Sequence, residues 1–169
     1  SLLLGGEGIA YPQVKPSQPD APKEFSLPPA SPTMRRVYAY LLQRRRIDRA
    51  VLTAFVRAGL IYEDAKYHNA VFVGRDEHGA ARHAHRRSTG DRGKPFRINV
   101  AGSDARYSFH WTGTSGRLYV FEAPIDLLSF LTLYPADWQA HSYVALCGLG
   151  EQAMLWMLEQ NPPIRQVLL

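Results

Sequence analysis

The sequence has a single cysteine and no long hydrophobic run. One cysteine, Cys147, excludes an internal disulfide and any metal site built from several cysteines, and it fits a reducing compartment. No apolar run approaches the roughly 20 residues that a helix needs to cross a bilayer, and the first residues lack the basic flank of a secretion signal. We therefore expect a cytoplasmic protein with no membrane segment, in which Cys147 is a small buried hydrophobe.

Acidic residues are scarce in the middle of the chain. Residues 35–117 hold 17 Lys and Arg against 7 Asp and Glu, whereas residues 118–169 hold one Arg against five acids. The whole chain carries a net charge of +5. A basic front followed by an acidic back is compatible with nucleic-acid binding, but an ordinary solvated face has the same composition, and charge alone leaves both alternatives open.

Proline is concentrated near the start of the chain. Seven of the 12 prolines lie within residues 11–33, and this density blocks helices and ladder hydrogen bonds, so we predict that residues 1–33 form a linker or a strap. A chain of 169 residues has room for one domain or for two small subdomains that share a core. We divide the rest into a basic α+β subdomain over residues 34–116 and a second region over residues 117–169.

Two helices and a hairpin are predicted in the basic subdomain. Thr33 is placed to cap the first helix, and Asp48 is placed to cap the second. We favour a helix pair that packs against a neighbouring sheet over a helix-turn-helix. Residues 69–75 and 80–87 have the pattern of a β-hairpin around a glycine turn, and residues 105–111 have the pattern of a short strand.

From residue 118 onwards the pattern becomes strand–helix–strand–helix–strand. Residues 118–121 and 142–147 are short apolar runs, as in strands buried on both faces, and residues 164–169 begin a third strand. Pro124 opens the first helix at a position that tolerates proline. This alternation predicts right-handed βαβ units with three parallel strands in one sheet, and the fold class is therefore α/β.

Two acids follow the first of these strands. Glu122 stands at the carboxyl end of the strand, which is where open α/β sheets bind their ligands. Asp126 lies in the first turn of the following helix, where the helix dipole favours a carboxylate. Both can face the same space, and such a pair suits a divalent cation with oxygen ligands. The alternative is that both are solvated charges, because a strand end is exposed and Asp is common in a first helical turn.

The segment from Leu118 to Leu128 resembles the opening motif of the Toprim fold of bacterial primases and topoisomerases, an apolar strand followed by Glu-Gly-x-x-Asp and a helix. Residues 142–150 resemble the second Toprim strand and its turn, and residues 164–169 resemble the third, which in the family runs into an Asp-x-Asp metal motif. Residues 69–87 are similar to a primase hairpin. Ala123 departs from the family, which prefers Gly there, and it requires a turn that an ordinary residue can adopt.

The resemblance covers residues 35–169 and is greatest to primase-like Toprim proteins of mobile elements, in which an upstream zinc-binding module is usual. It implies Mg²⁺-dependent nucleotidyl or phosphoryl transfer on single-stranded or duplex DNA, with a helicase or another replication protein as a further partner. Glu122 would be the catalytic acid/base or a metal-linked carboxylate, and Asp126 would help to hold the metal. Because the Asp-x-Asp motif is missing, we expect a truncated and inactive part of a longer protein.

Four basic residues are the candidates for nucleic-acid contacts: Arg86, Arg87, Lys94 and Arg106. The guanidinium group of arginine can donate two hydrogen bonds to one phosphate in bidentate fashion, and each phosphate contact makes binding more dependent on salt. A non-catalytic nucleic-acid-binding module with a degenerate Toprim core and a Toprim nuclease remain alternatives to the primase-like enzyme. His83 and His85 share a strand face without a nearby cysteine or carboxylate, so we favour surface imidazoles over a zinc site.

Overall fold

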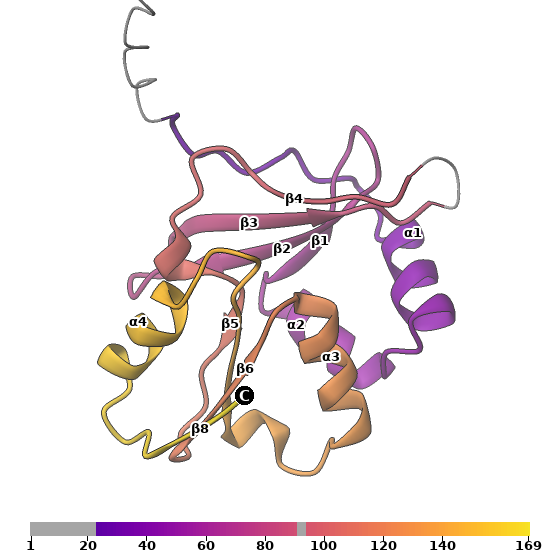
Figure 1. The fold of residues 1–169 in the computed structure, drawn as a ribbon. Helices are drawn as coiled ribbons and strands as arrows, with labels where there is room; N and C mark the ends of the chain where they lie inside the picture. The colour runs from indigo at the N-terminus through magenta and orange to yellow at the C-terminus, as the bar shows by residue number, and fades with distance from the viewer. Residues whose placement is uncertain (1–22, 91–93) are drawn as a thin grey trace, which may run out of the picture.

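The computed structural model describes residues 23–90 and 94–169, so most of the expected Pro-rich segment, residues 1–22, lies outside the described residues. The described part contains helices and two four-stranded sheets (Figure 1). The helical elements are α1 (Arg35–Tyr38), the π-helical η1 (Ala39–Arg44), α2 (Arg49–Arg57), the 3-10 turn η2 (Ala105–Tyr107), α3 (Pro124–Leu133), the 3-10 turn η3 (Trp138–Ala140) and α4 (Gln152–Gln160). The strands are β1 (Ile61–Glu63), β2 (Ala70–Arg75), β3 (Ala81–Arg87), β4 (Arg97–Asn99), β5 (His110–Trp111), β6 (Arg117–Phe121), β7 (Ser142–Ala145) and β8 (Gln166–Leu168).

The first sheet is antiparallel throughout, with the strand order β1-β2-β3-β4. The predicted hairpin is confirmed as β2 and β3, which pair from Ala70 opposite Arg87 to Arg75 opposite Ala81. Gly74 interrupts the register of this hairpin. A Cβ atom on Gly74 would lie 1.6 Å from the carbonyl oxygen of Tyr107, so only glycine lets η2 approach the sheet this closely.

The second sheet has the strand order β5-β7-β6-β8 and contains the parallel core. The predicted parallel arrangement is confirmed, because β6 pairs in parallel with β7 on one side and with β8 on the other. The strand expected over residues 105–111 is largely wrong. Asp104 accepts a hydrogen bond from the backbone N–H of Arg106 and caps the turn η2, which leaves only His110 and Trp111 to pair antiparallel with β7.

The cap predicted for the first helix is wrong, whereas the cap predicted for the second is confirmed. Met34 rather than Thr33 precedes α1, and the backbone N–H groups of Arg36 and Val37 donate to Oε1 of buried Glu63 at 2.9 and 3.0 Å. A carboxylate from β1 therefore satisfies the donors that a local side chain was expected to satisfy. In α2, Oδ2 of Asp48 accepts from the backbone N–H of Val51 at 3.1 Å. 

The largest hydrophobic core lies between the two sheets and includes α2 and α3. Phe55 of α2 stacks on Phe109, with 5.3 Å between ring centroids, and on Trp138, with 5.6 Å between ring centroids. The N-cap of α2 is also fixed to α3, because the backbone N–H of Asp48 donates to Oγ1 of Thr132. The second helix therefore packs against the sheets, which is the alternative that the sequence analysis favoured over a helix-turn-helix. None of the helices among the described residues has both the length and the apolar composition needed to span a bilayer.

Candidate functional site

Glu122 and Asp126 lie where the sequence placed them, at the carboxyl end of the central strand β6 and in the first turn of α3. Both side chains are exposed. Ala123, between them, has φ −132° and ψ 151°, which is ordinary extended backbone. The turn therefore needs no glycine, and the departure of this sequence from the family pattern causes no backbone strain.

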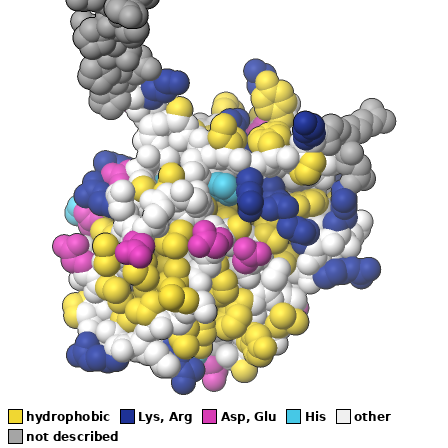
Figure 2. Space-filling model, in the orientation of Figure 1, with side chains coloured by type: hydrophobic (Ala, Val, Ile, Leu, Met, Phe, Trp, Pro, Cys, Tyr) yellow, Lys and Arg dark blue, Asp and Glu magenta, His cyan; other side chains and the backbone are white. Residues whose placement is uncertain are grey.

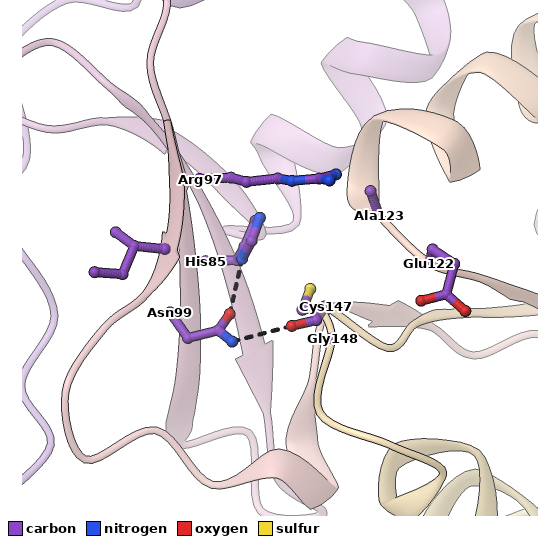
Figure 3. Close-up of a pocket in the computed structure, with 8 residues that line it drawn as sticks. His85, Arg97, Asn99, Glu122, Ala123, Cys147 and Gly148 are labelled. Carbon is purple, nitrogen blue, oxygen red and sulfur yellow. Dashed lines mark hydrogen bonds between the residues drawn. The ribbon is translucent and has the colours of Figure 1, made fainter. Parts of the chain in front are cut away.

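A cavity of about 350 Å³ lies where the ends of β6 and β7 meet β3 and β4. The first sheet contributes His85, Arg97 and Asn99, which lie opposite Glu122 and Ala123 (Figure 3). Side chains that are far apart in the sequence thus enclose the space in front of Glu122. The complete lining consists of His85, Arg97, Ile98, Asn99, Glu122, Ala123, Cys147 and Gly148.

One wall of this cavity is held by a short chain of hydrogen bonds. Nδ1 of His85 lies 2.7 Å from Oδ1 of Asn99, and Nδ2 of Asn99 donates to the carbonyl oxygen of Cys147 at 3.1 Å. Cys147 has a φ of 53°, a left-handed conformation that is uncommon outside glycine. The chain of hydrogen bonds connects β3, β4 and the turn after β7 (Figure 3).

The expectation that His83 and His85 are surface imidazoles is wrong, because both are buried, with 0% and 5% of their surfaces exposed. Burial lowers the pKa of His83 to about 4, and it is also the main cause that lowers the pKa of His85. The charges of Arg97 and Arg87 lower the pKa of His85 further, against the opposing effect of the hydrogen bond to Asn99. Both rings are therefore neutral near pH 7.

Cys147 is buried, as the sequence predicted. Burial raises the pKa of its thiol to about 11. The thiolate is the nucleophilic form of cysteine, and it is scarce at neutral pH when the pKa is this high. Cys147 therefore shapes the cavity wall and supplies a backbone carbonyl, and it is not poised for nucleophilic chemistry.

Two adjoining hollows, of about 310 and 320 Å³, are rich in arginine. Both include Arg45, Arg87 and Pro95, and the second also includes Arg97 and Asp126. We call the surface formed by Arg45, Arg87 and Arg97 the arginine groove. Figure 2 shows Lys and Arg side chains gathered next to a histidine, with Asp and Glu side chains in a row below them.

Arg97 connects the two parts of the site, because it lines both the cavity with Glu122 and the hollow with Asp126. The two acids expected to face one space therefore open on neighbouring hollows. Within residues 23–90 and 94–169, no group of three or more His, Cys, Asp or Glu side chains is arranged to hold a metal ion. Glu122 and Asp126 could thus supply only part of a Mg²⁺ shell.

The four basic residues predicted to contact nucleic acid do not all come together. Arg87 lies in the arginine groove, where its Nε donates to the hydroxyl of Tyr40 at 2.9 Å, and exposed Lys94 precedes Pro95 of the same groove. Arg86 alternates to the other face of β3, and its buried Nε has no hydrogen-bond partner among the described residues.

Arg106 lies apart from the arginine groove. Its Nη2 atom is 2.8 Å from Oδ2 of Asp104, and this ion pair raises the pKa of the guanidinium. Arg106 lines another hollow together with the acids Glu77 and Glu159. A guanidinium that is already paired and has acidic neighbours is a weaker site for phosphate than the groove arginines.

Sequence reasoning missed His85, Arg97 and Asn99 as members of the site. Arg97 and Asn99 alternate along β4 and so share one face, which is the signal that the sequence offered. The strand has only three residues, too few to be recognised by periodicity. Arg45 lies in a run of three arginines between the first two helices, and its position opposite Asp126 depends on the tertiary fold.

The chain is similar to several known proteins. Residues 39–115 match a family described as a protein of unknown function, DUF3991. An uncharacterized protein of Bacillus anthracis, pXO2-78, is 29% identical over 125 residues, which are 70% of this chain and 36% of that protein. The chain thus spans about a third of the length of this relative.

Among solved structures, the E. coli primase catalytic core has a TM-score of 0.52 at 14% identity, over 81% of this chain and 55% of that one. A DnaG primase catalytic domain bound to ssDNA has a TM-score of 0.50 at 15% identity, over 81% and 56%. A chain of a bacteriophage T7 complex that contains primase domains has a TM-score of 0.51 at 16% identity, over 76% and 56%. The chain has a mixed α/β, primase-like fold and spans about half the length of these structures.

Proposed function

We propose that this chain is part of a primase-like Toprim protein of a mobile element that acts on DNA, and that the longer protein performs Mg²⁺-dependent nucleotidyl or phosphoryl transfer. The observation that carries the proposal is the position of Glu122. It is an exposed carboxylate at the end of the central parallel strand, beside a cavity and an arginine groove, on a fold similar to primase catalytic cores.

In this proposal Glu122 acts as the acid/base or as a metal-linked carboxylate, and Asp126 helps to hold Mg²⁺. The metal, when bound, polarises the phosphate and stabilises the charge that develops on it. Two carboxylates from one strand–helix turn leave most of the octahedral shell to water, phosphate or further carboxylates. The Asp-x-Asp motif of the Toprim family, in residues beyond Leu169, would complete the site.

The test is activity in a longer form of the protein that includes the expected aspartates. We expect metal-dependent nucleotide incorporation on a single-stranded DNA template, and we expect Glu122→Gln to lower kcat at least 100-fold, because proton transfer contributes about 10²–10⁴-fold to catalysis. Gln is nearly isosteric, so the exposed strand end should remain folded. Glu151→Gln is the matched control, since Glu151 is also exposed and its side chain makes no cap at α4.

Three results would separate the alternatives. Metal-dependent incorporation that Glu122→Gln removes supports the primase-like enzyme. Strand cleavage in place of incorporation would indicate a Toprim nuclease. DNA binding with neither activity in the longer protein would indicate a non-catalytic module. Full activity of Glu122→Gln would show that Glu122 is only a solvated charge.

We place the DNA-binding surface of this protein on the arginine groove. The DnaG neighbour is described as bound to ssDNA, and the bacteriophage T7 primase domains as bound to an RNA/DNA hybrid, which supports single-stranded or duplex DNA as the partner. Arg45, Arg87 and Arg97 present donors on one surface that leads towards Glu122. We retain a helicase or another replication protein as a further partner.

DNA affinity measured against salt tests this surface. Replacing Arg45, Arg87 and Arg97 with Ala should weaken binding. It should also reduce the slope of log K against log salt concentration by about 2–3, because each lost phosphate contact reduces that slope by roughly 0.7–0.9. The matched control replaces exposed Arg49, Arg57 and Arg117, which changes the net charge equally outside the groove. Equal effects of the two triple variants would assign the binding to overall charge and not to the groove.

A further inference from the structure

His85 has one ring nitrogen that the fold uses and one that it leaves available. Nδ1 is engaged with Asn99, whereas Nε2 has no hydrogen bond to any of the described residues. The ring lies against Phe72, with 6.4 Å between centroids, and only 5% of the residue is exposed. Figure 3 shows the second nitrogen on the side of Arg97, within the cavity that His85 helps to line.

The protonation of the two nitrogens follows from the hydrogen-bond chain. A backbone carbonyl can only accept, so the amide nitrogen of Asn99 must face the carbonyl of Cys147. The carbonyl oxygen of Asn99 must then face His85, and Nδ1 must carry the proton that this oxygen accepts. In the neutral ring Nε2 is consequently unprotonated. The fold therefore holds an acceptor lone pair in the cavity.

The other cavity groups define which ligand would use this acceptor. Arg97 can only donate and suits a phosphate, whereas Nε2 of His85 and the Glu122 carboxylate both accept. A ligand that combines phosphate with hydroxyl groups would satisfy all three, and a nucleotide has both. We propose that Nε2 of His85 accepts a hydrogen bond from a sugar hydroxyl of a nucleotide whose phosphates lie towards Arg97 and the arginine groove.

This inference rests on the proposed function for the identity of the ligand, but it adds a residue and a selectivity that the proposed function lacks. The hydroxyl can be the 2′ or the 3′ group of the sugar, and the two are distinguished by the choice of probe. A nucleotide without the hydroxyl that His85 contacts leaves a buried acceptor unpaired, which weakens its binding.

The experiment compares three probes: ATP, 2′-deoxyATP and 3′-deoxyATP, titrated into the 169-residue protein in buffer with Mg²⁺. We expect one of the two deoxy nucleotides to bind about three- to tenfold more weakly than ATP, because one hydrogen bond is lost. In His85→Asn, the amide nitrogen can replace Nδ1 as the donor to Asn99, but no atom reaches the position of Nε2. This variant should bind all three nucleotides with the affinity of the weaker one.

His85→Gln provides the complementary variant, since its side-chain oxygen reaches the position of Nε2 and can accept. It should retain part of the discrimination that His85→Asn loses. Because both substitutions are at a buried residue, a second measurement is made on the unaltered protein. Long-range ¹H–¹⁵N NMR of the His85 ring should show the Nδ1–H tautomer, and ATP should shift the Nε2 resonance more than the Nδ1 resonance.

An Nε2–H tautomer, or equal affinities of the unaltered protein for all three nucleotides, would overturn the inference. Both results would leave the proposed function in place, since that depends on Glu122 and on the arginine groove. Absence of any nucleotide binding in a protein that still binds DNA through the groove would overturn the role of His85 and leave the DNA surface intact. Loss of activity in Glu122→Gln is measured separately and does not depend on the discrimination between sugars.

Discussion

At the scale of single residues, the histidines of β3 show how local polarity misleads. His83 and His85 alternate with Ala84 in the way that a solvated strand face alternates with a core face. Here Ala84 packs with Phe25 and Leu27, from the segment that precedes α1, on one side of the sheet. The histidines face the opposite side, which the second sheet covers. Because the covering residues are distant in the sequence, the pattern within β3 could not reveal that both faces are buried.

Burial of His83 predicts a loss of stability in acid. Neither ring nitrogen of His83 has a hydrogen bond among the described residues, and burial lowers its pKa from 6.5 to about 4. Between these two values the unfolded chain binds a proton that the folded protein does not, so stability is complete above about pH 6.5 and falls as the pH drops towards 4. We expect the free energy of unfolding to fall by about 2 kcal/mol between pH 7 and 4.5 from this residue.

Urea denaturation as a function of pH measures this effect. The acid limb is the fall in the free energy of unfolding as the pH decreases below 6.5. His83→Leu should make this limb less steep, and His78→Leu, at an exposed turn position, should leave it unchanged. The limb should not vanish in the first variant, because burial also lowers the pKa of His85 and of His110. An acid limb that His83→Leu leaves as steep as before would mean that His83 is protonated in the folded protein.

At the scale of elements, the sequence predicted the parallel sheet better than the antiparallel one. Strands β6 and β7 are apolar runs whose order and direction follow from the helices between them, so local pattern and topology agree. Strand β4 has three residues, of which two are polar, and it is defined by its pairing with β3. Position 105 begins a 3-10 turn because Asp104 caps it, although the surrounding residues alternate like a strand.

Gly74 gives a test of how closely these elements approach. A Cβ atom there would lie 1.6 Å from the carbonyl oxygen of Tyr107, so Gly74→Ala must push η2 away from β2. We expect a loss of at least about 3 kcal/mol, in the range of severe overpacking. Gly79→Ala is the matched control, because a Cβ atom on Gly79 would have nothing within 4 Å. The cost of this substitution comes from the φ of 80° alone and is about 1 kcal/mol. Chemical denaturation of both variants measures the difference, and equal losses would show that η2 moves freely.

At the scale of the whole molecule, the candidate site is formed by both sheets. The sequence predicted Glu122 at the end of a buried strand, because that position is local to one βα unit. It could not predict that His85, Arg97 and Asn99 lie opposite Glu122, since this depends on how the antiparallel sheet packs on the parallel one. The arrangement of side chains around Glu122 therefore depends on the two sheets keeping a fixed position relative to each other.

Contacts between aromatic rings hold the two sheets together, and we therefore predict that the described part of the chain unfolds as one unit. Phe72 of β2 meets Phe109 edge to face, with 5.4 Å between centroids, and Phe109 stacks on Phe55. Phe55 in turn contacts Trp111 of β5 and Trp138 of η3, with centroids 5.1 and 5.6 Å apart. This series of contacts passes from the first sheet through α2 to the second sheet without leaving the core.

Phe55→Ala should therefore destabilise both sheets together, by about 3–5 kcal/mol, because it removes a fully buried ring and leaves a cavity. Tryptophan fluorescence reports on Trp111, Trp138 and Trp156, which lie in the second sheet and in the elements packed on it, and hydrogen exchange of β2 and β3 reports on the first sheet. Both signals should shift by the same free energy in the variant, and Leu133→Ala, at a residue with 73% of its surface exposed, should change neither. Two separate unfolding transitions would mean that the two sheets belong to independent domains. In that case the cavity between His85 and Glu122 would not have a fixed shape, and substitutions in the antiparallel sheet would leave chemistry at Glu122 unaffected.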